Sequence, residues 1–156
     1  MNLAPSAIDS VAFDATATPV VIDTNLALDL LVFSDPAAEP LRLALGTRTL
    51  RWLATAGMRD ELARVLGYPQ IACRLPAAGA GAVLAAYDAL TQQVSAAPRL
   101  AEVPRCKDPD DQPFIDLAVA HRALLLSKDG AVLGLSPRLR PHGVRVASAW
   151  PPAAAG

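Results

Sequence analysis

Apolar and polar positions alternate along this chain in blocks that indicate alternating strands and helices. Short, continuous apolar runs rich in leucine or β-branched residues are typical of strands buried on both faces of a parallel sheet. Glycine ends two of the helical segments between these runs, at Gly46 and Gly67, as expected where the chain turns. The strands that we predict cover residues 19–23, 49–55, 100–103, 124–127 and 144–148.

Between the strands, apolar residues recur with the spacing of amphipathic helices. Residues 137–143 are expected to form a loop instead. Strands that alternate with helices predict an α/β fold of three layers, with a central parallel five-stranded sheet and helices on both faces. We predict the strand order 3-2-1-4-5, which places strands one and four side by side where the order reverses. The expected helices cover residues 25–32, 37–46, 57–66, 77–94, 111–123 and 130–135.

The length of 156 residues fits one domain. Residues 1–18 are small and polar, so we expect a weakly ordered lead-in before the domain. The domain itself is predicted over residues 19–148, and residues 149–156 form a tail rich in proline and alanine.

The composition restricts the partners and the compartment. With a net charge of −1, any site for a polyanion must be a local patch of the 14 basic residues. The two cysteines lie far apart in the sequence, which suits a reducing compartment and offers no zinc-binding spacing. No apolar run approaches the roughly 18 residues of a membrane span, and the first residues lack the features of a signal peptide. We therefore expect a cytoplasmic protein without a membrane partner.

Four acidic residues are predicted to converge on one edge of the sheet. Asp23 ends the first strand and Asp129 ends the fourth, and the carboxyl ends of neighbouring parallel strands meet at one crevice. Glu61 borders the apolar stripe of its helix, and Asp111 shares a helix face with Phe114. Both side chains are therefore expected to point toward the body of the domain.

Each of these acids also has a purely structural interpretation. Asp116, on the opposite face of its helix from Asp111, is expected to lie in solvent. The structural roles open to the residues of the site are helix N-caps for Asp23, Asn25 and Asp111, a surface ion pair between Glu61 and Arg64, and a turn before Gly130 for Asp129.

Four carboxylates in one cleft repel each other strongly unless a cation neutralises them. Ligands that are all oxygen suit Mg²⁺ or Mn²⁺. Such ions activate water and stabilise the charge of an in-line phosphoryl displacement. No histidine lies near the four acids in the sequence, which argues against a zinc hydrolase.

Over residues 19–148 the chain resembles the PIN-domain family of metal-dependent ribonucleases. The stretch DPDD at residues 108–111 resembles a subgroup described as toxins of type II toxin–antitoxin systems. The segments that carry the resemblance are VVIDTN at 20–25, DELARVL at 60–66, DPDDQPFIDLA at 108–118 and LLSKD at 125–129.

This resemblance implies an endoribonuclease that hydrolyses RNA phosphodiester bonds with a water activated by Mg²⁺ or Mn²⁺. Asp108 and Asp110 could each take the place of Asp111, which we choose for its distance from Phe114 and its helix face. The implied catalytic and metal-binding acids are Asp23, Glu61, Asp111 and Asp129, supported by Thr24, Asn25 and Lys128.

The resemblance also implies partners. These are an RNA substrate, a cognate antitoxin protein and a second copy of the chain in a homodimer. Basic side chains position nucleic-acid phosphates. The candidates for contacts with RNA are Arg51, Arg59, Arg105, Lys107, Arg138 and Arg140.

Two other enzyme classes require residues that this chain lacks, whereas one non-enzymatic function does not. A haloacid-dehalogenase-like phosphatase needs a second aspartate two residues after the first-strand acid, where this chain has Asn25. A P-loop or dinucleotide-binding enzyme needs a glycine-rich turn after the first strand, and the sequence has none there. A catalytically inactive PIN-like module that binds RNA or serves as a scaffold is compatible with the sequence.

Overall fold

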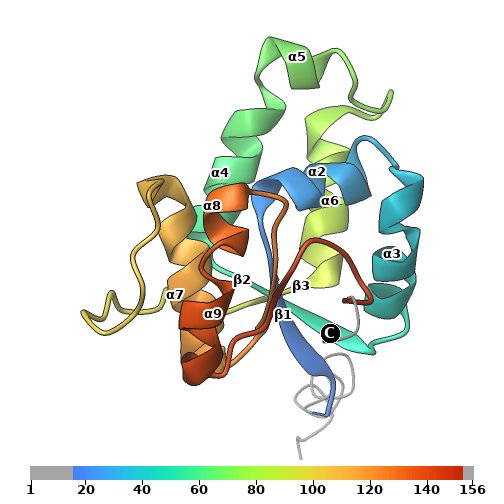
Figure 1. Cartoon of the computed structure of the whole chain (residues 1–156). Coiled ribbons are helices and arrows are strands. Elements are labelled where there is room, and N and C mark those ends of the chain that lie inside the picture. Colours follow the sequence, from blue (N-terminus) through green and yellow to red (C-terminus); the bar gives the residue numbers. More distant parts are fainter. Residues whose placement is uncertain (1–15, 153–156) are drawn as a thin grey trace, which may run out of the picture.

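The computed structural model describes residues 16–152 and contains one parallel sheet of five strands (Figure 1). The strand order is β3-β2-β1-β4-β5, which confirms the predicted fold class and topology. The strands are β1 (Thr18–Ile22), β2 (Leu50–Ala54), β3 (Thr91–Gln93), β4 (Leu124–Leu126) and β5 (Val146–Ala147).

Helices enclose the sheet. In Figure 1, α3 and α6 lie on one side of the strands, and α7 and α9 lie on the other. The α-helices are α2 (Thr24–Leu31), α3 (Glu39–Gly46), α4 (Ala56–Leu66), α5 (Pro69–Ala72), α6 (Gly79–Leu90), α7 (Gln112–His121), α8 (Gly130–Leu133) and α9 (Ser136–Leu139). Three short 3₁₀ helices complete the fold: η1 (Pro36–Ala38), η2 (Pro109–Asp111) and η3 (Arg140–His142).

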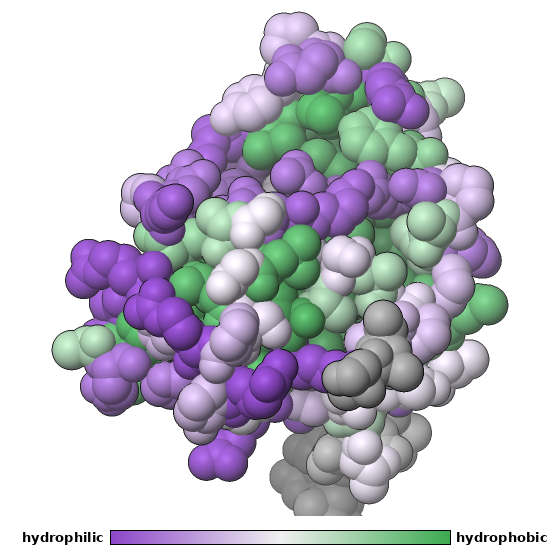
Figure 2. Space-filling view, in the orientation of Figure 1, coloured by the Kyte–Doolittle hydropathy of each residue, from purple (hydrophilic) through white to green (hydrophobic). Residues whose placement is uncertain are grey.

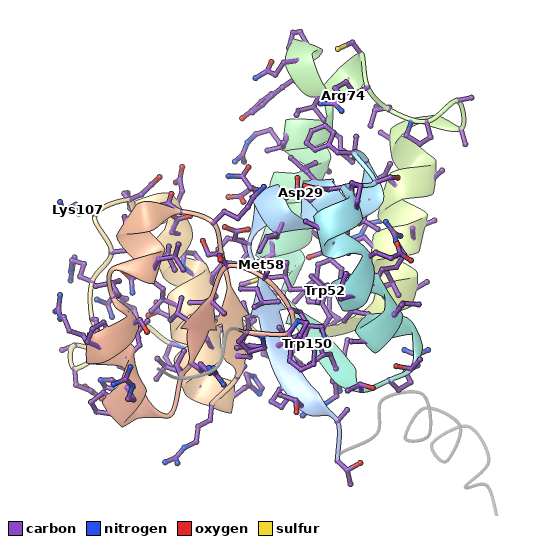
Figure 3. The ribbon with its side chains drawn as sticks, turned by 45° about the vertical axis from the view of Figure 1, so that its right-hand side comes forward. Asp29, Trp52, Met58, Arg74, Lys107 and Trp150 are labelled. Atoms are coloured by element: carbon purple, nitrogen blue, oxygen red, sulfur yellow. The ribbon has the colours of Figure 1, made fainter. Side chains whose placement is uncertain are left out.

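The centre of the sheet is apolar on both faces, as the continuous apolar runs predict. Val21 of β1 pairs with Leu125 of β4, and neither side chain is exposed. Trp52 of β2 is buried and meets the ring of Tyr87 edge-on, with the ring centroids 5.0 Å apart. Figure 3 shows Trp52 on the side of the sheet where α3 and α6 lie. Burial of this kind fixes the two central strands, and therefore their carboxyl ends, in place.

The predicted third strand is wrong. The strand forms at Thr91–Gln93, where Thr91 pairs with Trp52, and not at residues 100–103. Helix α6 therefore ends at Leu90, before the predicted end at residue 94. Its cap Thr91 takes up an extended backbone, and its hydroxyl donates to the carbonyl of Tyr87 at 2.9 Å. A polar three-residue edge strand carries no hydrophobic period, so the pattern alone did not indicate it.

The predicted loop at residues 137–143 is also wrong. It contains most of α9 and the whole of η3, and each of these short helices has a proline in its first turn. Proline fits there because its fixed φ suits a helix and no intrahelical donor is lost. Gly143 then ends η3 with a φ of 79°, a conformation that favours glycine.

The prediction that Asp116 lies in solvent is wrong. Its side chain is buried, accepts a hydrogen bond from Gln112 Nε2 at 3.0 Å and lies 3.6 Å from Arg99 Nη1. The segment before α7 covers this side of the helix and turns an apparently solvated acid into a partner of a buried polar network.

Two further expectations concern the ends of the chain and the membrane. Most of the predicted lead-in, residues 1–15, and the last residues of the tail, 153–156, lie outside the described residues. Among residues 16–152, no helix is both long and apolar enough to cross a lipid bilayer.

Candidate active site

A cavity of about 200 Å³ lies at the carboxyl ends of β1 and β4. The register of these strands places Ile22 beside Leu126, so the residues that follow the two strands emerge together. The lining includes all four predicted acids, Asp23, Glu61, Asp111 and Asp129, together with Thr24, Asn25, Arg64, Val65, Tyr68, Asp110 and Phe114.

Asp23 is the most buried of the four acids, with 5% of its surface exposed. Its Oδ1 accepts a hydrogen bond from the backbone N–H of Leu26 at 2.9 Å, so it does cap helix α2. Its Oδ2 accepts from the hydroxyl of Ser127 at 2.6 Å. Burial raises the pKa of Asp23, and these hydrogen bonds oppose part of that effect by stabilising the carboxylate. The cap and the cavity are therefore compatible roles for one side chain.

Ser127 also positions Asp129. The backbone N–H of Asp129 donates to Ser127 Oγ at 3.1 Å, and Asp129 Oδ1 caps α8 through the N–H of Ala131 at 2.7 Å. The sequence interpretation missed Ser127. The available signal was a small hydroxyl residue at the end of a buried strand, next to the acid of a neighbouring strand.

Glu61 enters the cavity from α4. The hydroxyl of Thr24 donates to its Oε2, which ties α4 to the first turn of α2. Arg64 instead donates to the hydroxyl of Tyr68 at 3.4 Å, and within residues 16–152 it forms no ion pair with Glu61. The surface ion pair that would have given Glu61 a purely structural role is thus not formed.

Asp111 has the most unusual environment. Its Oδ2 is buried and has no hydrogen-bond partner in the described part of the chain, and its side chain makes no cap bond to α7. Burial, together with the neighbouring charges of Asp129 and Asp108, raises the pKa of Asp111 to about 6. Asp108 caps η2 through the N–H of Asp110 and does not line the cavity, whereas Asp110 does.

The donor atoms fit a hard divalent cation in kind, because carboxylate and hydroxyl oxygens line the cavity and no histidine or cysteine of residues 16–152 does. The orphaned oxygen of Asp111 is consistent with such a ligand. Among the described residues, however, no three His, Cys, Asp or Glu side chains form a group that could hold an ion. A cation would therefore have to draw the carboxylates closer together.

Lys128 does not line the cavity. Its ammonium group donates to Asp29 Oδ2 on α2. Two of the predicted RNA contacts also have protein partners: Arg51 donates to Gln92 at 3.0 Å, and Arg59 forms two hydrogen bonds with Asp88. Figure 3 shows Lys107 at the outer edge of the molecule.

The remaining basic candidates lie elsewhere on the surface. Arg105 and Arg138 line a separate groove, and Arg140 is exposed within η3. The structure therefore brings none of the six predicted RNA contacts into the carboxylate cavity.

Two cavity residues were not predicted. Arg64 is the one basic side chain that lines the cavity within residues 16–152, and Tyr68 is 40% exposed at its edge. They follow Glu61 by three and seven positions, the spacing of one helix face. That spacing was the signal in the sequence that would have identified them.

The chain is similar to one known protein family. The family model of the PIN domain matches residues 19–129 of the sequence, from the first strand to the last of the four acids. No curated protein and no solved structure matches the chain significantly. The match spans well over half of the sequence, and the chain therefore belongs to the PIN-domain family.

Proposed function

We propose that this protein is a metal-dependent endoribonuclease that hydrolyses RNA phosphodiester bonds with an activated water. PIN domains are generally nucleases, and the family therefore supports a hydrolase. The observation that carries the proposal is the buried, unpartnered Oδ2 of Asp111 in a cavity lined by four further carboxylates. An orphaned buried oxygen is rare in proteins, and a bound ion is one of its ordinary explanations.

Asp23, Glu61, Asp111 and Asp129 would hold the cation, which we propose to be Mg²⁺ or Mn²⁺. When bound, the cation would supply a water of lowered pKa and stabilise the negative charge that develops on the leaving oxygen.

The protein's own contribution is orientation. Ser127 and the N–H of Leu26 hold both oxygens of Asp23, and Thr24 holds Glu61. The guanidinium of Arg64 is suited to bind a non-bridging phosphate oxygen, since it presents several donors in a planar fork. We assign it the role of binding the scissile phosphate from the α4 side of the cavity.

We further propose that the protein is the toxin of a type II toxin–antitoxin system, acting in the cytoplasm with a cognate antitoxin and as a homodimer. The support is the DPDD stretch, which contributes Asp110 and Asp111 to the cavity. Induced expression should then arrest growth with the wild type and not with Asp23→Asn. Growth that is unaffected by an active nuclease would contradict the toxin assignment alone.

A second candidate function, an inactive PIN-like module that binds RNA or acts as a scaffold, is favoured by one observation. The acids of the described residues do not form a group ready to hold an ion. Such a module would keep the fold and the surface charges and lack metal-dependent turnover.

The deciding experiment is cleavage of a mixed, end-labelled RNA pool by wild type, Asp23→Asn and the control Asp60→Asn. Asp60 is an exposed acid on α4 outside the cavity. Products that require Mn²⁺, disappear with EDTA and form only with wild type and control are the expected result. Products that persist in Asp23→Asn would exclude this residue from the mechanism.

Melting gives a second measurement that does not depend on finding the substrate. A ligand that binds only the folded state stabilises it, by about 2.7 kcal/mol at a concentration of 100 Kd. Mn²⁺ should raise the melting temperature of EDTA-stripped wild type and of Asp60→Asn, and not that of Asp23→Asn. An unchanged wild-type melting curve at millimolar metal would count against the site.

A further inference from the structure

A second hollow, of about 490 Å³, lies beside the segment that precedes α7. We call it the basic groove, defined by Arg99, Arg105, Arg138 and His142. Among residues 16–152, Glu102 is the one acid that lines the basic groove. The groove and the carboxylate cavity have no lining residue in common. Its excess of basic groups suits a polyanion, although the whole chain is slightly acidic.

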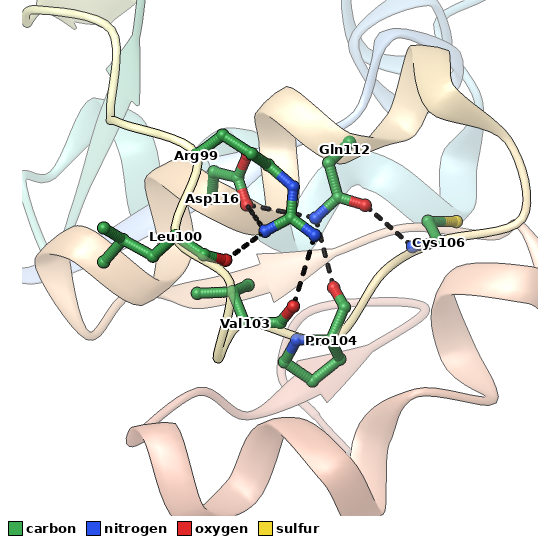
Figure 4. Close-up of polar contacts among 7 residues, drawn as sticks. All are labelled: Arg99, Leu100, Val103, Pro104, Cys106, Gln112 and Asp116. Carbon is green, nitrogen blue, oxygen red and sulfur yellow. Dashed lines mark hydrogen bonds and ion pairs between the residues drawn. The ribbon is translucent and has the colours of Figure 1, made fainter.

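One wall of the groove is held by buried polar contacts (Figure 4). Gln112 Nε2 donates to the carbonyl of Pro104 at 3.1 Å, and Gln112 Oε1 accepts from the N–H of Cys106 at 2.7 Å. The same Nε2 donates to Asp116, and both Gln112 and Asp116 are buried. The side chains of α7 thus fix the backbone from which Arg105 projects.

Arg99 completes this wall from the other end. Its guanidinium donates to the carbonyls of Leu100 and Val103 and lies 3.6 Å from Asp116 Oδ1. Asp116 therefore offsets the charge of Arg99, whose role is to hold the segment in place. A wall fixed in this way presents its remaining cations without a large ordering cost on binding.

Arg105 and Arg138 are the cations left for a ligand. Both are exposed, and neither guanidinium group has a hydrogen-bond or ion-pair partner in residues 16–152. They lie on different elements, the segment before α7 and helix α9, so they approach the groove from two sides. Figure 2 shows hydrophilic side chains gathered along the edge of the molecule where that segment runs.

We propose that the basic groove binds the sugar–phosphate backbone of an RNA strand whose scissile phosphate lies in the carboxylate cavity, an inference that rests on the proposed function. The chain that leaves Arg105 reaches Asp110 and Asp111 of the cavity within six residues, which links the two sites along one segment. Guanidinium groups pair well with phosphate oxygens.

The residues that line the groove also indicate whether it would select a particular RNA sequence. The apolar part consists of Ala101 and the buried Val103 and Pro104, and among the described lining residues His142 has the one ring that could stack on a base. An acidic peptide would need apolar anchor sites that this lining does not offer. Contacts to phosphates alone carry no sequence information, so the groove would position RNA without selecting its sequence.

The test is binding of a fluorescein-labelled 20-nucleotide oligouridylate to the full chain in EDTA, followed by fluorescence anisotropy. The groove variant is Arg105→Gln with Arg138→Gln, and the matched control is Arg48→Gln with Arg74→Gln. All four arginines are exposed, and the control pair lines neither the groove nor the cavity. Melting curves of both variants confirm that each is folded.

We expect the groove variant to bind about tenfold more weakly than wild type, and the control to bind as wild type does. The slope of log K against log salt is negative, and its magnitude should fall by about 1.4, since each phosphate contact on a single strand contributes about −0.7. Equal affinity of wild type and groove variant would overturn the proposal, as would the absence of RNA binding by wild type. An oligoglutamate peptide that binds the groove more tightly than the RNA does would also overturn it, in favour of a protein partner.

The result is separable from that of the nuclease test because no cleavage occurs in EDTA. Metal-dependent cleavage with binding that does not depend on the groove would overturn the groove alone. Groove-dependent binding without cleavage by wild type would overturn the nuclease and leave the groove as an RNA site.

Discussion

Ser127 Oγ lies 2.6 Å from Asp23 Oδ2 and joins residues that are 104 positions apart in the sequence. The hydroxyl follows β4 and the carboxylate follows β1, so the contact exists only because these two strands are neighbours. Ser127 Oγ also accepts a hydrogen bond from the backbone N–H of Asp129. One hydroxyl therefore sets the positions of two of the four proposed metal-binding acids.

Ser127→Ala should reduce both stability and cleavage. Removing the donor takes the side-chain hydrogen bond away from a buried carboxylate, which costs about 1–3 kcal/mol. Because the Ser127 hydrogen bond lowers the pKa of Asp23, its loss should raise that pKa further. Urea unfolding measures the first effect, and a shift of the acidic limb of the cleavage–pH profile to higher pH measures the second.

Ser95→Ala is the matched control, since Ser95 is exposed and lies outside the cavity. It should behave as wild type in both measurements. A Ser127→Ala variant with the wild-type pH profile would show that the hydroxyl does not tune Asp23.

The pH dependence of the metal-free protein should report on Asp111. Its pKa is about 6 in the folded chain, above the ordinary value of 3.8, so the folded state binds the proton more tightly. The resulting stabilisation is fully present below pH 3.8 and is lost as the pH rises through 6. We expect Asp111→Asn to make EDTA-treated protein about 1 kcal/mol more stable at a pH of about 7.5, a value reduced for solvent screening.

Melting temperatures between about pH 4 and pH 8 in EDTA test this expectation. The wild type should lose stability across this range more steeply than Asp111→Asn does. Asp60→Asn, the exposed control on α4, should follow the wild-type curve. Parallel curves for Asp111→Asn and wild type would contradict the electrostatic strain inferred for Asp111.

The parts of this fold that the sequence predicted are those whose stability is local and apolar. Val21 and Leu125 belong to continuous apolar runs, and both lie fully buried at the centre of the sheet. An acid within three residues of the end of such a run emerges at the edge of the sheet, which is why Asp23 and Asp129 could be placed. Strand β3 could not be predicted, because Thr91 and its polar neighbours are strand only through pairing with β2.

The details of the site depend on relations between distant segments. The contact between Ser127 and Asp23 requires the register of β1 against β4, which no local pattern encodes. The burial of Asp116 requires the segment before α7 to fold back over the helix. The orientation of the Lys128 side chain could have been predicted. Residues 127 and 129 turn toward the site, and side chains alternate along an extended chain, so residue 128 turns away.

Arg64→Ala should weaken substrate binding without destabilising the fold. Arg64 is exposed and lines the cavity, so its loss removes a phosphate contact and little packing. We expect KM for an RNA substrate to rise about tenfold, equivalent to about 1.4 kcal/mol for one charge-assisted hydrogen bond. Steady-state cleavage measures KM, and Arg64→Lys should recover part of the loss.

Arg74→Ala serves as the control, since Arg74 is exposed and lies outside the cavity. A lower kcat with unchanged KM would instead assign Arg64 to the chemical step.

Substitution of Lys128 shows whether this cation beside the site has a structural or a catalytic role. Its ammonium group is paired with Asp29, which is only 7% exposed, so Lys128→Met leaves a buried carboxylate without its partner. We expect a loss of about 1–3 kcal/mol in urea unfolding. The double variant Asp29→Leu with Lys128→Met should recover most of that loss, because it removes both charges and keeps apolar volume. Cleavage per folded molecule should match the wild type in both variants, since Lys128 points away from the cavity. A double variant that is stable and yet inactive would show that the charge of Lys128 acts on the substrate itself.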